Sequence, residues 1–452
     1  MDDSNANGVV ENCSELLVGC DSLEEKVFHV HVMVLSSMSK YFKARLESGL
    51  EPQTSPNGIS ASPAAPLELR VPMELAELEA AEVLFRCMYG ATAECAAKLV
   101  IERGAQNSAA AGAQMALFLR AYRLADRFEA VQCMDVFSRH INGFKPADIT
   151  LDAALVFFGL QPALRDRLKK MGITCSQVLL LIFGDAPSVI RSPHLTAQFE
   201  SLPHAAVLDW SLQDNLLVHS ENCVVYLLSA WVNKHPDIST KEANQLACNI
   251  RVLHLSDAYL HTLLPNLEWM KNFYGMKNLP TLHFIRLGTL SKAHHFHPSS
   301  WISKPQRKQS STASSPLVFE LSGPASAQSA LPQYMNGLWI KPSYSICYDY
   351  VNLKLALDFP KELGQFTNVW KAFGQACAIV IPEVLRQDNR TYQKCSHGSW
   401  KENEFQIIHY APPFSSSSSI MQRRPNLSMK DTLAPYLVDG NLLLRVTIPR
   451  IK

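Results

Sequence analysis

The sequence predicts a multidomain chain with three folded parts: an α+β domain, an all-α domain and, at the end, a β-sandwich. Three observations support this fold class. The 452 residues exceed a single core and suit two or three domains of roughly 100–200 residues each. Proline-rich and serine-rich tracts interrupt the chain, which indicates an insertion and a domain boundary. The spacing of apolar residues also changes along the chain, from mixed to helical to alternating.

The composition excludes several classes of protein. Hydrophobic residues make up 47% of the chain, which excludes global disorder. Lys and Arg number 42 against 41 for Asp and Glu, so the net charge of +1 gives no whole-chain signature of a nucleic-acid partner. The 11 cysteines include no C-x-x-C pair, which indicates reduced thiols rather than a disulfide framework.

Two features bear on location. Residues 1–7 are acidic and polar, unlike a secretory signal or a transit peptide. The longest apolar run, residues 178–183, is far shorter than the roughly 18 residues that suggest a membrane span. We therefore expect a soluble protein of the cytoplasm, the nucleus or both, with no membrane partner.

The first part covers about residues 12–142. Short apolar runs predict strands near residues 16–18, 27–31 and 67–71, and the spacing of apolar residues predicts one helix over residues 32–46. Two further helical stripes consist of Val83, Leu84, Cys87 and Met88, and of Met115, Phe118, Leu119 and Tyr122. A small sheet covered by helices is expected, and residues 51–66, with their four prolines, form a loop insertion. A further loop is expected at residues 104–113.

Residues 28–42 (FHVHVMVLSSMSKYF) resemble the signature of the BTB/POZ domain, in which an aromatic residue, a valine and a histidine precede a leucine, a serine and a terminal Tyr-Phe. Residues 83–90 resemble the family's helix that ends in Tyr-x-Gly. Residues 124–128, followed by Cys133, resemble its Ala-Asp-Lys-Tyr helix. The resemblance implies an α+β BTB/POZ domain over residues 12–142 that forms a homodimer.

The dimer interface is assigned to Leu35, Met38 and Phe42, because these apolar positions are too many for a small sheet to bury unaided. His31 has no acidic or cysteine partner at ligand spacing. We interpret it as a junction histidine that is bonded within the fold.

The second part, residues 144–275, is helical throughout. Its strongest helix follows Ser220, which we predict to be the N-cap, and Glu221 places negative charge in the first turn. Its apolar face consists of Val224, Leu227, Leu228 and Trp231. This helix, together with residues 253–256 downstream, resembles the BACK domain that follows BTB in many adaptor proteins. Trp231 is interpreted as a core residue.

Residues 276–316 form a connector. Its second half, residues 299–316, is rich in serine and carries a basic cluster of Lys304, Arg307 and Lys308. This composition predicts a solvated linker.

The third part, residues 317–452, alternates apolar and polar residues. The apolar positions change parity near Tyr350 and Val351, which predicts a bulge or a strand break there. The last strand, residues 442–448, follows a turn at Asp439-Gly440. Residues 436–448 resemble the end of MATH (TRAF-like) sandwiches, which implies a β-sandwich here.

No catalytic, cofactor or metal site is predicted. The histidines at 283, 294, 295 and 297 and the pair Cys395 and His397 lack the spacing of tetrahedral zinc ligands. The motifs of nucleophile elbows and of phosphate-binding loops are also absent from the sequence.

The order BTB, BACK and MATH-like region implies a non-catalytic substrate-recognition adaptor of a cullin-RING ubiquitin ligase, with a second copy, a cullin and an unknown protein target as partners. The cullin surface is assigned to Phe42, Arg45, Leu46 and Glu47. Cullin-binding members often carry an apolar-x-Glu element here, which residues 46–52 do not match cleanly. A BTB-dimerised scaffold or transcriptional co-regulator therefore remains an alternative, as does an enzyme built on the Cys and His residues of the tail.

Overall fold

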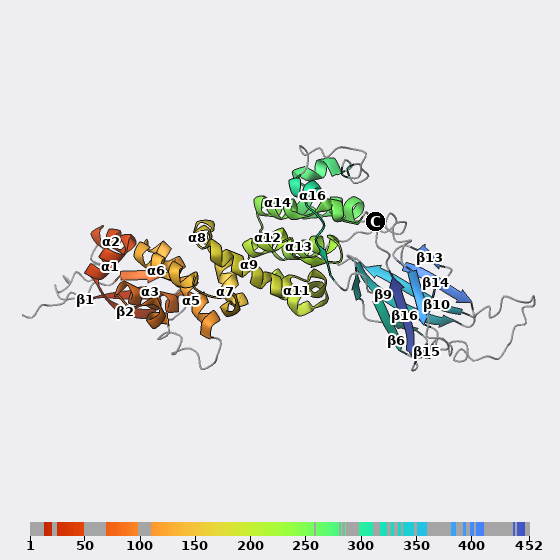
Figure 1. The fold of residues 1–452 in the computed structure, drawn as a ribbon, viewed down its shortest axis with the longest axis horizontal. Helices are drawn as coiled ribbons and strands as arrows, with labels where there is room; N and C mark the ends of the chain where they lie inside the picture. The colour runs from red at the N-terminus through yellow and green to blue at the C-terminus, as the bar shows by residue number, and fades with distance from the viewer. Residues whose placement is uncertain are drawn as a thin grey trace, which may run out of the picture. The chain divides into compact units, whose positions relative to one another are not determined.

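The computed structural model describes residues 13–19, 25–48, 69–97, 110–256, 259–279, 282, 285 and 298–310, and the strands between residues 317 and 447 (Figure 1). The predicted insertion at 51–66 lies outside these residues. The chain forms two compact units, residues 1–181 and 182–452. Within the part of the chain that is described, no helix is long and apolar enough to cross a membrane.

Unit 1 begins with a three-stranded sheet in the order β2-β1-β3. Strand β1 (Cys13–Gly19) pairs antiparallel with β2 (Glu25–His31), where Leu16 lies opposite Phe28, and parallel with β3 (Leu69–Pro72). Between β2 and β3 the chain therefore passes from one side of β1 to the other. The three predicted strands are confirmed.

Two helices follow β2, where the sequence predicted a single one. They are α1 (Val32–Met38) and α2 (Lys40–Glu47). Ser39 between them has an extended backbone, with φ −140° and ψ 121°. Its hydroxyl accepts a hydrogen bond from the Phe42 amide at 3.2 Å and donates one to the Phe128 carbonyl at 2.5 Å. The prediction of one continuous helix over residues 32–46 was wrong, because this serine caps a new helix.

The remaining helices of unit 1 cover the sheet and extend beyond it. They include η1 (Leu75–Glu77), α3 (Leu78–Met88), α5 (Ala110–Arg127), α6 (Val131–Ile141), η2 (Pro146–Asp148), α7 (Leu151–Phe158), α8 (Pro162–Arg167) and α9 (Lys169–Phe183), which contains the unit boundary. Both predicted stripes, on α3 and α5, are buried. The prediction of a loop at 104–113 is wrong from residue 110 onward, because α5 begins there.

Unit 2 begins with a helical part, as predicted. Its elements are α10 (Ala186–Arg191), α11 (Pro193–Glu200), α12 (His204–Leu212), β4 (Leu217–Val218), α13 (Asn222–Lys234) and α14 (Thr240–Asn249), followed by the short turns η3 (Val252–His254), η4 (Tyr259–Leu263), η5 (Leu264–Asn266), η6 (Glu268–Met270) and η7 (Tyr274–Asn278).

Helix α13 is the centre of this helical part. Every residue from Asn222 to Val232 is buried, so the helix is enclosed on all sides rather than on one face. Its N-cap is Glu221 and not the predicted Ser220, and Glu221 makes no side-chain cap bond to the helix. The predicted core role of Trp231 is confirmed: it is 2% exposed and its indole N–H donates to the Leu202 carbonyl at 2.8 Å.

The sequence prediction for the connector was wrong. Residues 298–310 are not a solvated linker, because they form α16 (Ser299–Ser303) and β5 (Lys308–Gln309) against the helical part. Figure 1 shows α16 beside α14, although the two are far apart in the sequence. Trp301 is 1% exposed and its indole N–H donates to the Ala247 carbonyl at 2.8 Å. Strand β5 pairs parallel with β4.

The described strands of the last part form two sheets. One consists of β7 (Ala327–Ser329), β8 (Gln333–Met335), β9 (Leu338–Cys347), β10 (Tyr350–Asp358), β13 (Gly398–Lys401) and β14 (Glu404–Tyr410). The other consists of β6 (Leu317–Ser322), β11 (Ile381–Leu385), β12 (Tyr392–Lys394), β15 (Leu437–Val438) and β16 (Asn441–Thr447).

Two local predictions for this part agree with the strand pairing. The predicted strand break near Tyr350 corresponds to the end of β9 at Cys347 and the start of β10 at Tyr350, which pair antiparallel. The predicted last strand corresponds to β16, and β15 pairs with it across Asp439-Gly440. The β-sandwich itself stays a prediction.

Candidate functional site

An open depression lies between α1 and α2 in unit 1. Its volume is about 390 Å³, and it is lined by Val32, Ser36, Ser37, Lys43, Leu46 and Glu47. Two of the four residues that the sequence assigned to a cullin surface, Leu46 and Glu47, therefore line one concave surface. Side chains of α1 form the other part of its lining.

The depression depends on the break at Ser39. Because the chain changes direction there, α2 packs beside α1 instead of continuing it. The hydroxyls of Ser36 and Ser37 donate to the carbonyls of Met33 and Val34, at 3.2 and 2.9 Å. These serines satisfy their hydrogen bonds within their own helix, so α1 presents a surface of small side chains.

The rim of the depression carries opposite charges. The Lys43 ammonium lies 3.9 Å from the Glu47 carboxylate, and the two side chains are 58% and 67% exposed. An ion pair this exposed contributes little to stability, so both groups are free to pair instead with charges on a partner. Leu46 is half-buried and supplies the apolar surface between them.

Arg45 does not line the depression. Its guanidinium donates to the Tyr41 hydroxyl at 2.7 Å and lies 5.8 Å from the centre of the Tyr41 ring. This arrangement holds the Arg45 side chain along its own helix. The sequence placed Arg45 with Leu46 and Glu47 because they are neighbours in the chain, but successive helical residues point in different directions.

Phe42 is a core residue of a single chain. It is 0% exposed, and its ring centre lies 5.0 Å from that of Phe128 and 6.0 Å from that of Phe85. The prediction that the Phe42 side chain contacts a cullin or a second copy is therefore wrong, because residues of its own chain cover it. Leu35 is likewise 2% exposed. The argument that these residues need a second copy to bury them does not hold, and of the three only Met38 keeps exposed surface.

His31 is placed as the sequence predicted. It precedes α1 at the end of β2, where its ring Nδ1 lies 3.2 Å from the Tyr89 hydroxyl. The Tyr89 hydroxyl also accepts from the backbone N–H of His31. The histidine is bonded within the fold.

The described residues offer no group of three or more His, Cys, Asp or Glu side chains that could hold a metal ion. The histidines at 283 and 294–297 and the pair Cys395 and His397 lie outside those residues. Burial raises the pKa of the Cys87 thiol to about 12 and that of Cys133 to about 11. Both therefore stay protonated and unreactive at neutral pH.

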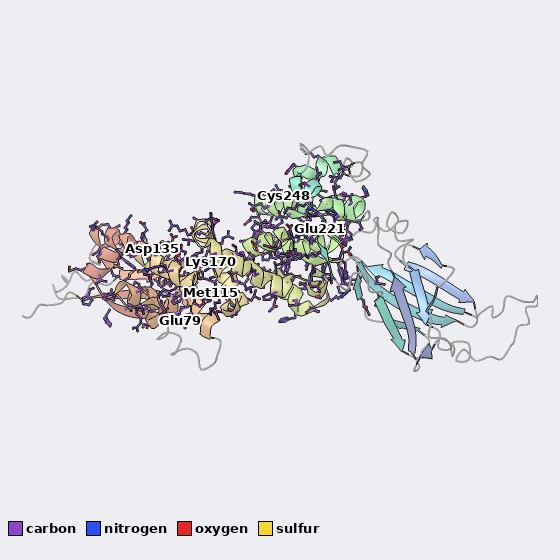
Figure 2. The ribbon with its side chains drawn as sticks, viewed as in Figure 1. Glu79, Met115, Asp135, Lys170, Glu221 and Cys248 are labelled. Atoms are coloured by element: carbon purple, nitrogen blue, oxygen red, sulfur yellow. The ribbon has the colours of Figure 1, made fainter. Side chains whose placement is uncertain are left out.

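Sequence reasoning missed two sets of residues. The first is the α1 side of the depression, Val32, Ser36 and Ser37, because the predicted continuous helix hides the angle between α1 and α2. The available signal was Ser39, since serine is a preferred N-cap. The second is Arg307, whose side chain is 0% exposed and donates to the Glu221 carboxylate at 3.0 Å. Glu221 is labelled in the helical part in Figure 2.

Comparison with protein families gives two matches. The BTB/POZ domain matches residues 11–133, and BACK (BTB And C-terminal Kelch) matches residues 190–265. A C-terminal MATH domain is not detected, so that expectation is not supported. No curated protein matches the sequence. BTB and BACK domains are typically non-catalytic protein-interaction modules. The chain thus carries a BTB/POZ domain followed by a BACK domain.

Proposed function

We propose that this chain is a substrate-recognition adaptor of a cullin-RING ubiquitin ligase. In this role it binds a cullin with the depression between α1 and α2. It dimerises through its BTB domain and binds a target protein with residues beyond the BACK domain.

The depression carries this proposal. It combines a half-buried apolar residue, Leu46, with an exposed pair of opposite charges, Lys43 and Glu47, on a concave surface of about 390 Å³. An apolar contact with a charged rim is the composition of a protein docking surface. The order of BTB and BACK, which is typical of such adaptors, supports the same role.

The mechanism is tethering. An adaptor that holds a target near a ligase raises the effective concentration of the target's lysines at the ubiquitin-transfer site. A dimer presents two cullin surfaces and two target surfaces, which increases avidity without a new contact. We assign to Met38 a place in the dimer interface, because it is the predicted interface residue with exposed surface.

Co-purification of the full chain with a cullin tests the proposal. Changing Leu46 to Ala and Glu47 to Lys together removes the apolar contact and reverses a rim charge. We expect this double variant to lose the cullin, while circular dichroism and light scattering show unchanged helix content and an unchanged dimer. Arg45→Ala is the matched control on the same helix, because Arg45 lies outside the lining, and it should keep the cullin.

Two outcomes would contradict the proposal. Undiminished cullin capture by the folded double variant would remove the depression from the interface. Absence of cullin capture by the parent protein, with the dimer intact, would favour a BTB-dimerised scaffold or transcriptional co-regulator.

A further inference from the structure

The docked connector carries a short basic motif that ends in a serine. Arg307, Lys308 and Gln309 precede Ser310. Protein kinases with acidic substrate clefts select serines that follow an arginine by three residues, because the guanidinium pairs with carboxylates of the cleft. We propose that Ser310 is a phosphorylation site for such a basophilic kinase, and that docking of the connector and phosphorylation exclude each other.

Arg307 is the first reason for this exclusion. Its side chain is 0% exposed, and its Nε donates to the Glu221 carboxylate at 3.0 Å. One Nη donates to the Ser211 carbonyl at 2.7 Å. The same guanidinium cannot occupy both this site and the acidic cleft of a kinase. A kinase that reads Arg307 therefore acts only on a connector that has left the helical part.

Ser310 is the second reason. It is 5% exposed, and its backbone N–H donates to the Val218 carbonyl at 3.0 Å, next to the pairing of β5 with β4. A phosphoryl group adds a charge of about −1.5 to −2 and oxygens that require water or cations. A site that is 5% exposed gives water little access to that charge. Phosphorylated Ser310 therefore keeps this end of the connector undocked.

The connector has a second anchor that does not involve the motif. Trp301 is buried against the helical part and donates to the Ala247 carbonyl. A Cβ on Gly275 would lie 3.0 Å from the Trp301 ring, so the indole fits closely there. Residues 307–310 can therefore undock, with loss of the β4–β5 pairing, while Trp301 stays in its site.

The modification is an ordinary phosphoryl transfer. The Ser310 hydroxyl oxygen attacks the γ-phosphorus of ATP, the bond to ADP breaks, and the hydroxyl proton passes to the kinase base. The products are phosphoserine and ADP. This proposal goes beyond the adaptor role and does not depend on cullin binding.

The test is phosphorylation of the folded full chain by the catalytic subunit of cyclic-AMP-dependent kinase, with Ser310 occupancy read by mass spectrometry. A synthetic peptide of residues 302–316 serves as the undocked reference. We expect the peptide to react about tenfold or more faster than the parent chain, because only the rare open form of the chain reacts. Glu221→Gln removes the charge that holds Arg307, so it should raise the rate toward that of the peptide.

Val225→Ala is the matched control, because Val225 lies in the first turn of the helix that Glu221 precedes and is equally buried. It is not a hydrogen-bond partner of the connector in the described structure. It should destabilise α13 without exposing Ser310. Limited trypsin cleavage after Arg307 gives a second readout, which should increase in Glu221→Gln and in the phosphorylated chain. Three results would overturn the proposal: an unreactive peptide, a parent chain that reacts as fast as the peptide, or equal acceleration by Val225→Ala and Glu221→Gln.

Discussion

The aromatic cluster around Phe42 in unit 1 and the ion cluster around Arg307 in unit 2 are equally buried but differ in how they are encoded. Phe42 packs against Phe85 on α3 and against Phe128, which directly follows α5. Both helices carry an apolar stripe that is visible in the local sequence. Arg307 pairs with Glu221, 86 residues earlier in the chain. Periodicity reveals the first kind of core and not the second, because an ion pair between distant segments leaves no local pattern.

The two clusters also differ in their energetics. Burial of an aromatic side chain is favourable by itself, in proportion to the apolar area removed from water. Burial of a charge is unfavourable unless a partner of opposite charge and hydrogen bonds compensate it. Phe42 therefore stabilises its unit alone, whereas Arg307 and Glu221 are compatible with the fold only as a pair.

Arg307→Ala should produce the largest effect, because it leaves the Glu221 carboxylate buried without its ion pair. We expect a loss of about 3–5 kcal/mol in the stability of the helical part of unit 2. The double variant Glu221→Gln with Arg307→Met should recover most of this loss, because no charge then remains unpaired.

Phe42→Ala should cost about 3–5 kcal/mol in the stability of unit 1, and no substitution of a partner residue should restore it.

Hydrogen exchange of amides in α13 and α3 measures the two units separately in the full chain. A double variant that is as unstable as Arg307→Ala would contradict this account. The ion pair would then add net stability to unit 2 and not only offset the cost of burying its two charges.

The second-largest effect should be a loss of stability of unit 2 at acidic pH, caused by protonation of His219. Burial lowers the pKa of His219 to about 4, and the charge of Arg191 acts in the same direction. The unfolded chain binds a proton near pH 6.5 and the folded chain does not until about pH 4. Stability is therefore unaffected above pH 6.5 and falls by about 3 kcal/mol as the pH drops from 6.5 to 4. His219→Gln should remove this slope, as measured by urea unfolding at several pH values, and an unchanged slope would assign it to other groups.

Much of the fold followed from local patterns, and two of the four residues assigned to a cullin surface line the depression. The stripes on α3 and α5 identified core residues correctly, because each stripe lies on one helix. Leu46 and Glu47 do line the depression, but they lie at the end of α2 and not at the end of the single helix that the sequence predicted. Phe42 was assigned to the surface because a helical stripe shows that one face is covered, but not whether the cover comes from the same chain or from another. The connector was misread because serine dominates the composition of residues 299–316, while two buried residues, Trp301 and Arg307, hold it against the helical part.

Ser39→Ala should have a smaller effect on stability. It sharpens the comparison because it removes a buried polar group beside the aromatic cluster of unit 1. Ser39 is 1% exposed and hydrogen-bonds to the Phe42 amide and the Phe128 carbonyl. Loss of a helix cap and of a buried hydrogen bond should cost about 1–2 kcal/mol. Ser36→Ala is the control on α1, where the hydroxyl bonds only to its own helix, and it should change stability by less than about 0.5 kcal/mol. Equal effects of the two changes in thermal unfolding would mean that Ser39 does not anchor the start of α2.

Lys43→Glu should have the smallest effect on stability and so separates the role of a charge in folding from its role in binding. The Lys43 and Glu47 side chains are 58% and 67% exposed and 3.9 Å apart, so water already solvates both. Loss of their attraction should change the free energy of unfolding by no more than about 0.5 kcal/mol, and less in high salt. Lys43 and Arg307 each pair with a glutamate, so the two ion pairs differ mainly in burial. If this exposed substitution destabilised unit 1 by as much as Arg307→Ala destabilises unit 2, burial would not be what makes the Arg307 pair indispensable. If instead stability is kept while cullin capture falls, the Lys43 charge acts on a partner and not on the fold.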